Sequence, residues 1–241
     1  MEYVIGGHSV TEAALDPSLR VRLTERSAAR FSGNTLFDEV ARTVCAAGCL
    51  PRKELYESWE VARRVRRLFR GGRVVDLACG HGLLAALMLI LDDTSPVAVA
   101  VDTRIPKSAP RLLEVLEARW PKLRGRIELR RAPLASVALT HHDVVVSAHA
   151  CGSLTDDVLA AAIAARARVA VLPCCHLLRE PDAGAYAGWL DGALSIDVRR
   201  AMRLEAAGFH TYTRTIPREI TEKNRLLLAR PPGNERLLSE S

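Results

Sequence analysis

The sequence predicts an α/β fold, a seven-stranded and mostly parallel sheet with a helical cap at its N-terminus. A glycine-containing turn separates a β-forming stretch at 74–77 from an apolar helical stretch at 83–91. Further β-forming and helical stretches then alternate along the chain, which is typical of parallel strands joined by helices. The last two strand-like stretches, 209–216 and 225–229, are too close for a helical crossover and must pair antiparallel.

The N-terminal part reads as helices that precede the sheet. Residues 1–34 are polar and weakly patterned. Thr35 can cap a helix that ends at Gly48, and Pro51 interrupts the chain before a second helix over 53–69. We therefore divide the chain into a helical cap at 1–70, a main domain at 71–231 and a polar tail at 232–241.

The main domain alternates valine-rich runs with amphipathic or apolar segments. The runs predict parallel-type strands at 74–77, 97–102, 127–131, 143–149 and 168–173. Serine and glycine at segment boundaries predict helices at 83–91, 108–120, 153–165 and 195–207. For the third of these helices, Ser153 and Asp156 have the spacing of a capping box.

The turn after the first strand carries the pattern Asp76-x-Ala78-x-Gly80-x-Gly82. Its glycines allow a sharp turn and let a ligand approach the backbone closely. A nucleotide-like cofactor binds at such strand-turn-helix junctions in open α/β sheets. The chain has neither GxGxxG nor a Walker lysine, so a dinucleotide or a nucleoside triphosphate is not the first expectation.

The ends of the next strands supply further candidate cofactor contacts. Asp102 ends the second strand and is expected to accept hydrogen bonds from both ribose hydroxyls of a nucleoside, with Thr103 beside it. Pro133 and Leu134 follow the third strand and are expected to line the adenine, and Ser147 lies in the fourth strand. We expect Asp76 to orient the turn rather than to take part in chemistry. The alternative for Asp102 is that it only begins a turn.

Two motifs rich in cysteine and histidine follow the fourth and fifth strands. Because the carboxyl ends of parallel strands share one edge, we expect both motifs to meet in one crevice beside the cofactor turn. Their candidate catalytic residues are His149, Cys151, Cys174 and His176, with Thr155 as a candidate substrate contact.

Four explanations of these motifs remain open. The residues could bind zinc, although adjacent cysteines suit one tetrahedral ion poorly. A cysteine thiolate could add to a pyrimidine ring, as in RNA 5-methylcytosine enzymes. The cysteines could simply pack at crowded strand ends, which is our expectation for Cys79 and Cys175. Finally, His149 or His176 could serve as a base or orienting group while the neighbouring cysteines shape the pocket.

The glycine turn resembles the first motif of class I S-adenosylmethionine (AdoMet) methyltransferases, with Ala78 in place of the usual first glycine. The His-x-Cys-Gly-x-x-Thr-Asp and Cys-Cys-His motifs are similar to those of the eukaryotic tRNA 2′-O-methyltransferases acting on the acceptor stem. The resemblance covers about residues 74–229 and implies a Rossmann-like fold with AdoMet as cofactor. It implies that AdoMet is held by Asp76, Gly80, Gly82 and Asp102, and that the reaction centre is lined by His149, Cys151, Thr155, Cys174 and His176.

The chain also departs from those tRNA enzymes. Their zinc-binding modules are absent, and Ser147-Ala148 replaces the usual residues ahead of the histidine. The resemblance therefore does not extend to the same tRNA substrate.

Two polar residues near the last turn, Asn224 and Arg225, are candidate substrate contacts. They belong to the stretch 220–225, which is expected to form the loop of the final hairpin. The alternative is an ordinary solvated turn.

Charge and composition favour a polyanionic partner, with RNA as the plausible one. The formal net charge is +6 and the pI about 9.2. Only four Phe and four Tyr are present, so backbone binding is expected rather than stacking on bases. The alternative is a solvated arginine-rich surface. The basic residues form three clusters: Arg20, Arg22, Arg26 and Arg30; Arg63, Arg64, Arg66, Arg67, Arg70 and Arg73; and Arg124, Arg126, Arg130 and Arg131.

Other classes of protein are disfavoured. No apolar run approaches the roughly 20 residues of a membrane span, and the first residues lack the profile of a signal peptide. A cytoplasmic location is therefore expected, with the six cysteines present as thiols.

The resulting hypothesis is an AdoMet-dependent methyltransferase acting on an oxygen or nitrogen of RNA, either tRNA or rRNA. Three alternatives remain: a small-molecule methyltransferase, an RNA 5-methylcytosine methyltransferase with a catalytic cysteine, and a non-catalytic RNA-binding protein with an AdoMet fold.

Overall fold

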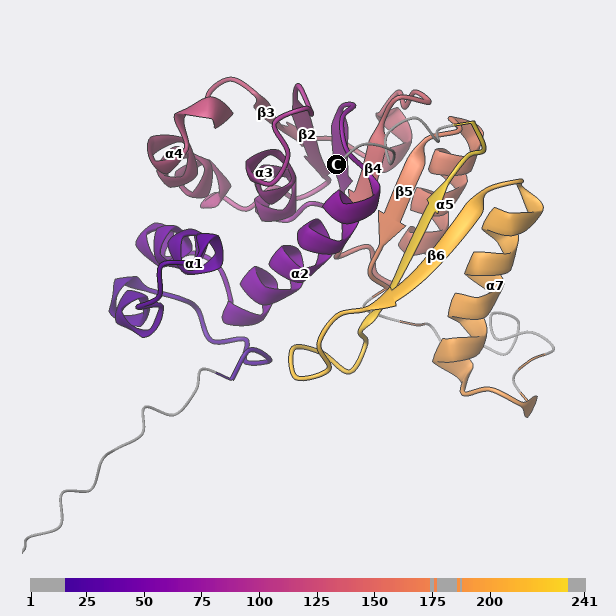
Figure 1. Ribbon diagram of the computed structural model, residues 1–241, viewed down its shortest axis with the longest axis horizontal. Coiled ribbons are helices and arrows are strands. Elements are labelled where there is room, and N and C mark those ends of the chain that lie inside the picture. Colours follow the sequence, from indigo (N-terminus) through magenta and orange to yellow (C-terminus); the bar gives the residue numbers. More distant parts are fainter. Residues whose placement is uncertain (1–15, 174–175, 177–185, 187, 234–241) are drawn as a thin grey trace, which may run out of the picture.

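A seven-stranded sheet in the order β3-β2-β1-β4-β5-β7-β6 forms the centre of the protein (Figure 1). The computed structural model describes residues 16–173, 176, 186 and 188–233. The strands are β1 (Val74–Leu77), β2 (Ala98–Asp102), β3 (Ile127–Arg131), β4 (Val144–Ser147), β5 (Arg168–Val171), β6 (His210–Thr215) and β7 (Arg225–Arg230). The first five are parallel, and β7 pairs antiparallel with both β5 and β6. The predicted fold class is therefore confirmed.

The described α-helices cover both faces of this sheet (Figure 1). They are α1 (Leu36–Ala47), α2 (Arg52–Leu68), α3 (Leu83–Ile90), α4 (Ala109–Arg119), α5 (Leu154–Ala164) and α7 (Gly192–Ala206). Short 3-10 segments lie at Glu25–Arg30, Pro121–Leu123 and Leu134–Ser136. None of these described helices combines the length and the hydrophobicity needed to cross a bilayer.

Alternate residues of the strands divide the core into two halves. Val74 of β1 and Val144 of β4 pack with α1 to α4 in one half. Their neighbours Val75 and Val145 pack in the other half, which also takes apolar residues of α5 and α7. This follows from the two-residue period of a strand, which sends successive side chains to opposite faces.

The N-terminal helices pack directly on the main domain. α1 begins at the predicted cap, where the Thr35 hydroxyl accepts a hydrogen bond from the Asp38 amide at 3.2 Å, and ends at Gly48 with a left-handed backbone. α2 packs mainly against α3, and α1 against α4. Both therefore belong to the same hydrophobic core as the sheet.

A sharp turn reverses the chain between α2 and β1. Gly72 has a φ of +81°, and a Cβ atom there would stand only 2.1 Å from the His142 carbonyl oxygen, so only glycine fits. Because the chain reverses here, α2 runs antiparallel to β1. The beginning of α2 therefore lies toward the carboxyl ends of the parallel strands, and its end lies toward their amino ends.

One predicted helix start was wrong, and one predicted capping box does not form, although α5 begins after Ser153 as expected. Ser153 makes no side-chain cap bond to α5, and its backbone already has a helical conformation. α7 begins at Gly192 rather than Ser195, because the Asp191 carboxylate accepts the Leu194 amide at 3.0 Å and supplies the cap. Both errors concern short polar side chains, whose hydrogen bonds depend on the backbone around them.

Candidate active site

The turn between β1 and α3 has one packed side and one open side. Ala78, Gly80 and Gly82 all have positive φ, of 59°, 54° and 78°. A Cβ atom at Gly82 would lie 3.0 Å from Leu129 Cδ2, so this glycine permits close packing on the sheet. A Cβ atom at Gly80 would approach only the Glu54 carboxylate, at 3.8 Å. The backbone at Gly80 is therefore open on the side that faces α2.

Asp102 lies directly beside this turn. Its Oδ2 accepts the Gly80 amide at 3.1 Å, and its Oδ1 accepts the Arg104 amide at 2.9 Å. The side chain is half-buried at the end of β2. The acidic group expected next to the cofactor turn is thus at hydrogen-bonding distance from its backbone.

Asp76 connects β1 to the helix that follows the turn. Its carboxylate is buried and accepts the Ala85 amide of α3 at 3.2 Å. Burial raises the pKa of Asp76 well above its usual value, and the nearby carboxylates of Asp102 and Glu54 raise it further. These contacts agree with a role in orienting the turn.

The remaining predicted cofactor residues lie at the neighbouring strand ends. Thr103 is exposed, and its carbonyl accepts Arg131 Nε at 3.2 Å. Pro133 is exposed and Leu134 is half-buried, just after the Ala132 amide that donates to the Asp102 carbonyl. Ser147 is buried, and its hydroxyl accepts the Ala150 amide at 3.2 Å, so it shapes the turn after β4.

A cleft of about 660 Å³ lies between the start of α2 and the end of β4. It contains His149 and Cys151 of the first motif, and both are accessible from it. It also contains Glu54, the residue that faces Gly80, so the cleft adjoins the glycine turn. Its full lining is Ser18, Arg20, Pro51, Lys53, Glu54, Glu57, His149, Cys151, Ile220, Thr221, Glu222 and Lys223.

The other predicted substrate contacts are engaged within the fold. Thr155 is buried and donates its hydroxyl hydrogen to the Ala150 carbonyl at 2.6 Å. Asn224 closes the β6–β7 loop by donating to the Ile216 carbonyl at 3.0 Å. Arg225 is the first residue of β7 rather than a loop residue, and its Nε donates to Asp197 at 2.7 Å. The described hydrogen bonds of these three side chains are therefore to other residues of the protein.

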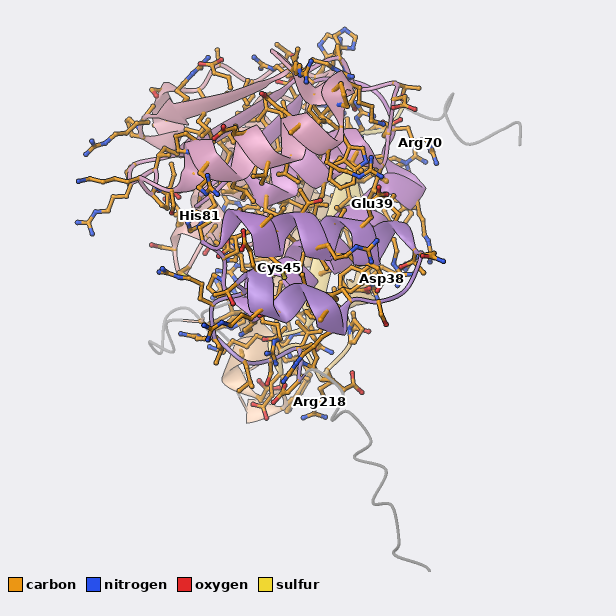
Figure 2. All side chains as sticks on the ribbon, turned by 90° about the vertical axis from the view of Figure 1, so that its left-hand side faces the viewer. Asp38, Glu39, Cys45, Arg70, His81 and Arg218 are labelled. Carbon is orange, nitrogen blue, oxygen red and sulfur yellow. The ribbon has the colours of Figure 1, made fainter. Side chains whose placement is uncertain are left out.

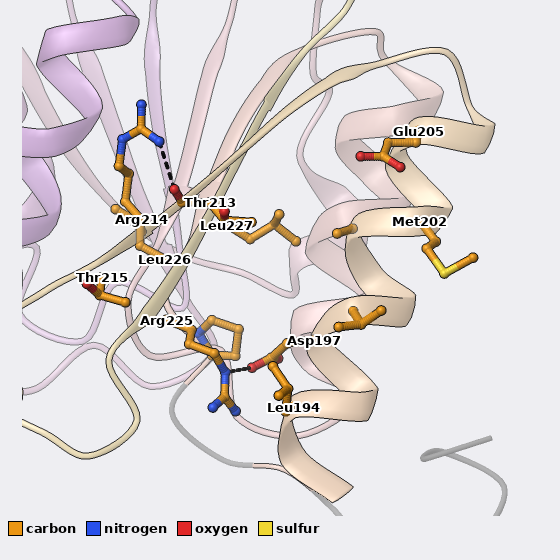
Figure 3. A pocket seen from close by; sticks show the side chains of 13 residues that line it. Leu194, Asp197, Met202, Glu205, Thr213, Arg214, Thr215, Arg225, Leu226 and Leu227 are labelled. Carbon is orange, nitrogen blue, oxygen red and sulfur yellow. Dashed lines mark hydrogen bonds and ion pairs between the residues drawn. The ribbon is translucent and has the colours of Figure 1, made fainter. Parts of the chain in front are cut away.

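His176 of the second motif belongs to a buried network with α7. Its Nε2 lies 2.8 Å from Asp197 Oδ1, and its side chain is only 3% exposed. Its Nδ1 is buried and has no hydrogen-bonding partner among the described residues. Burial opposes ionisation of Asp197, but hydrogen bonds from His176 and Arg225 prevail and lower its pKa. Figure 3 shows Arg225 reaching Asp197 beside a groove of about 680 Å³ between α7 and the β6–β7 hairpin.

Arg200 of α7 ties the two motifs together. It makes a bidentate contact with Asp156 of α5, at 3.0 and 2.8 Å, and it also donates to the Gly152 carbonyl at 3.0 Å. A fourth contact, at 3.3 Å, reaches Asp197. One guanidinium group therefore links the turn after β4 to Asp197, which in turn contacts His176.

The histidines of the two motifs face different helices. His149 lies in the cleft beside α2, whereas the His176 imidazole bonds to α7. The two histidines therefore do not meet as expected, because strand order places the ends of β4 and β5 side by side but does not determine to which face each side chain turns. Cys174 and Cys175 lie outside the described residues.

Sequence reasoning missed several residues of these sites. Glu54 and Glu57, three positions apart on α2, lie in a segment interpreted only as a helical cap, although their spacing places them on one face of the helix. Asp197 and Arg200 have the same spacing on α7 and were also missed. Within the part of the chain that is described, no group of three or more histidine, cysteine, aspartate or glutamate side chains could hold a metal ion.

The arginine cluster before β1 lies away from the cleft. Arg66 is buried, pairs with Asp92 at 3.0 Å and donates to the Met88 carbonyl. Arg73 makes a two-pronged contact with Asp143, at 3.0 and 2.7 Å, near the amino ends of β1 and β4. In Figure 2, Arg70 of this cluster and His81 of the glycine turn lie on opposite sides of the molecule. Much of this cluster therefore supports the fold.

Residues 54–180, more than half of the chain, match a family of methyltransferase domains. The chain belongs to this methyltransferase family. No curated protein matches it at a significant level.

Solved structures of other proteins have the same fold as this chain. One is the B. subtilis M1A22 tRNA methyltransferase TrmK, with 16% identity and a TM-score of 0.50 over 71% of this chain and 65% of the other. Another is a protein from Nostoc punctiforme proposed to be an O-methyltransferase, with 16% identity and a TM-score of 0.50 over 85% of this chain and 66% of the other. The present chain therefore covers just under two thirds of the length of each of those two proteins.

The cofactor of this class of methyltransferase is AdoMet, and the described residues fit it. The open backbone at Gly80 gives room for a ligand to approach, and Asp102 lies at the edge of the turn with acceptor oxygens for hydroxyl groups. When bound, AdoMet supplies the methyl group as an electrophile. The carboxylates of Glu54 and Asp102, beside the turn, suit a ligand that carries positive charge.

Proposed function

We propose that the protein is an AdoMet-dependent RNA methyltransferase that modifies an oxygen or nitrogen atom of its substrate. The proposal is based mainly on the cleft, which contains both His149 and Glu54, the residue that faces the glycine turn. A substrate bound in this cleft would lie next to the cofactor turn. Proximity and orientation would then supply much of the rate enhancement.

His149 would take the proton of the acceptor group. A neutral imidazole is a suitable base near pH 7. The half-buried His149 follows the end of β4, which pairs with β1, so it lies near the turn that follows β1. Cys151, in the same cleft, would contribute to the pocket wall.

The preference for RNA rests on where the cations lie. Arg20, Lys53 and Lys223 all line the cleft. Arg20 belongs to the N-terminal basic cluster, and this segment runs beside the start of α2, where the Lys53 amide donates to the Leu19 carbonyl at 3.1 Å. With a net charge of +6, the protein would attract a polyanion, and these three cations would hold phosphates at the mouth of the cleft.

The test compares two pairs of charge reversals in fluorescence binding of labelled tRNA and rRNA fragments at increasing salt. Arg20→Glu with Lys223→Glu should weaken RNA binding at least tenfold and reduce its salt dependence, while calorimetry shows unchanged affinity for S-adenosylhomocysteine (AdoHcy). Arg67→Glu with Arg70→Glu, at exposed sites outside the cleft, is the control and should change RNA binding much less. Nucleoside mass spectrometry of RNA from a deletion strain would then identify the modified atom. Equal RNA affinity in both double variants would refute the proposed binding surface.

One observation favours a second candidate, a small-molecule methyltransferase. The cleft has three carboxylates, Glu54, Glu57 and Glu222, beside its three cations, and its volume is typical of small-molecule sites. Absence of RNA binding by the wild-type protein at low salt, together with normal AdoHcy binding, would favour this candidate.

The exposed Cys151 gives a route to distinguish 5-methylcytosine chemistry. A thiolate that adds to the base would be trapped covalently by RNA containing 5-fluorocytosine. A trapped adduct that is lost in Cys151→Ser would replace the proposed non-covalent transfer.

A further inference from the structure

Glu57 is a buried carboxylate on α2 that has no role in the reaction proposed above. It is only 6% exposed and lies on the wall of the cleft. Its ion pair is with Lys53, one turn earlier on α2, at 3.5 Å. A buried carboxylate is costly unless charged or hydrogen-bonding partners compensate it, so this position calls for an explanation.

Glu60, the next glutamate on α2, is an example of a buried carboxylate that is stabilised by ion pairs within its own helix. It is also buried, but it forms ion pairs with both Arg63, at 3.1 Å, and Arg64. Glu57 lacks such a pair of arginines and instead opens onto the cleft. The two glutamates on one helix are therefore in different environments.

His149 lies in the same cleft as Glu57. Burial raises the pKa of Glu57, whereas Lys53 and His149 act in the opposite direction and favour its ionised form. Within the described part of the chain, no hydrogen bond holds the His149 side chain. A carboxylate is the usual partner that orients a histidine and stabilises its protonated form.

We propose that Glu57 is a positioning residue for His149, orienting its imidazole in the cleft and stabilising the imidazolium formed during methyl transfer. This rests on the proposed function. The O–H or N–H bond of the acceptor breaks, and its proton passes to the imidazole. The acceptor electron pair forms the new bond to the methyl carbon, while the electrons of the S–CH₃ bond return to sulfur and give a thioether. His149 later releases the proton to water.

Through Glu57, the N-terminal helical part would contribute to catalysis. Glu57 lies 92 positions before His149 in the chain, and α2 brings it to the end of β4. The charged or titratable groups that share the cleft with His149 are Arg20, Lys53, Glu54, Glu57, Cys151, Glu222 and Lys223. Two of these, Lys53 and Glu57, give opposite and testable effects on the imidazole.

The direct test is an NMR titration of the seven histidines in the full-length protein, with His149→Ala to assign the signal. Glu57→Gln removes the carboxylate charge and should move the His149 titration measurably to lower pH. Lys53→Met removes the competing cation and should raise it. Glu114→Gln, at an exposed position of α4, is the matched control and should leave it unchanged.

Turnover gives the second readout. Glu57→Gln should lower kcat about tenfold with little change in KM, and should move the rising limb of the pH–rate profile to lower pH, as the His149 pKa falls. Glu57→Asp, which keeps the charge on a shorter side chain, should recover part of kcat. A purely structural Glu57 would change stability without moving the pH profile.

Specific results would overturn the inference. An unchanged His149 pKa in Glu57→Gln, with normal AdoHcy binding, would refute the pairing and leave the proposed function intact. Loss of AdoHcy binding by the wild type, with the expected pKa shifts present, would refute the function and not the pairing. If Glu57→Gln does not fold, an unchanged His149 pKa in Lys53→Met would refute the pairing.

Discussion

Replacing Arg200 with methionine tests the network that joins the two strand-end motifs. The Arg200 side chain is 4% exposed and donates to Asp156, Gly152 and Asp197 at 2.8 to 3.3 Å. Methionine has a similar length and no charge, so it would fill much of the space and remove all four contacts. The carboxylate of Asp197 and the carbonyl of Gly152 would lose a buried donor.

The expected loss of stability is about 3 kcal/mol. Removing one partner of a buried ion pair costs about 3–5 kcal/mol, because the other charge remains buried. The lower end applies here, since Asp156 is 40% exposed and solvent can replace its partner, and Asp197 keeps His176 and Arg225. A loss of this size is a large fraction of the total stability of a domain, about 5–15 kcal/mol.

Urea unfolding followed by circular dichroism measures this loss as a difference in the free energy of unfolding. Arg200→Lys keeps the charge but not the two-pronged contact, so it should fall between the wild type and Arg200→Met. Arg203→Met, at an exposed position of the same helix, is the control and should change stability by less than about 0.5 kcal/mol. A loss below about 1 kcal/mol in Arg200→Met would refute the argument that this network holds the two turns together.

Two further predictions concern the cofactor turn. Gly80→Ala should lower AdoHcy affinity at least tenfold in calorimetry, because the new methyl group occupies the open side of the turn; the positive φ of this residue should also cost about 1–2 kcal/mol of stability. The control is Ala78→Gly, which relieves backbone strain of the same kind at a neighbouring position and should bind AdoHcy normally. Equal affinities in the two variants would contradict the assigned site. The Asp76→Asn variant should become more stable relative to the wild type as pH rises from about 4 to 8. The pKa of Asp76 is higher in the folded state than in the unfolded state, where it is about 3.9. The stabilisation by Asp76 is therefore fully present below the unfolded-state pKa and is lost as pH rises through the folded-state pKa. A stability difference that is independent of pH in urea unfolding would show that Asp76 does not titrate as its burial requires.

Local patterns in the sequence were enough to predict the fold. The runs at β1, β2 and β4 are valine-rich, and glycine follows β1 at the point where the chain must turn. A strand followed by a buried helix can return to a parallel strand with only a few topologies, which limits the possible strand orders. The position of Asp102 beside the turn follows from the same order, because β1 and β2 are neighbours.

Side-chain partners far apart in the sequence were not predictable in the same way. Arg73 pairs with Asp143, 70 positions away, so a residue read as part of an RNA-binding cluster is held near the amino ends of the strands. The direction of His176 depends on Asp197 of α7, and nothing in the local Cys-Cys-His motif indicates that helix.

The sequence by itself determined the α/β class, the glycine turn and the acidic residue beside it, because secondary-structure period and backbone conformation are local properties of the chain. Only the tertiary structure decided that His149 shares a cleft with Glu57 while His176 turns to Asp197. The cost of burying charge makes each such group depend on a partner, and packing of distant helices selects that partner.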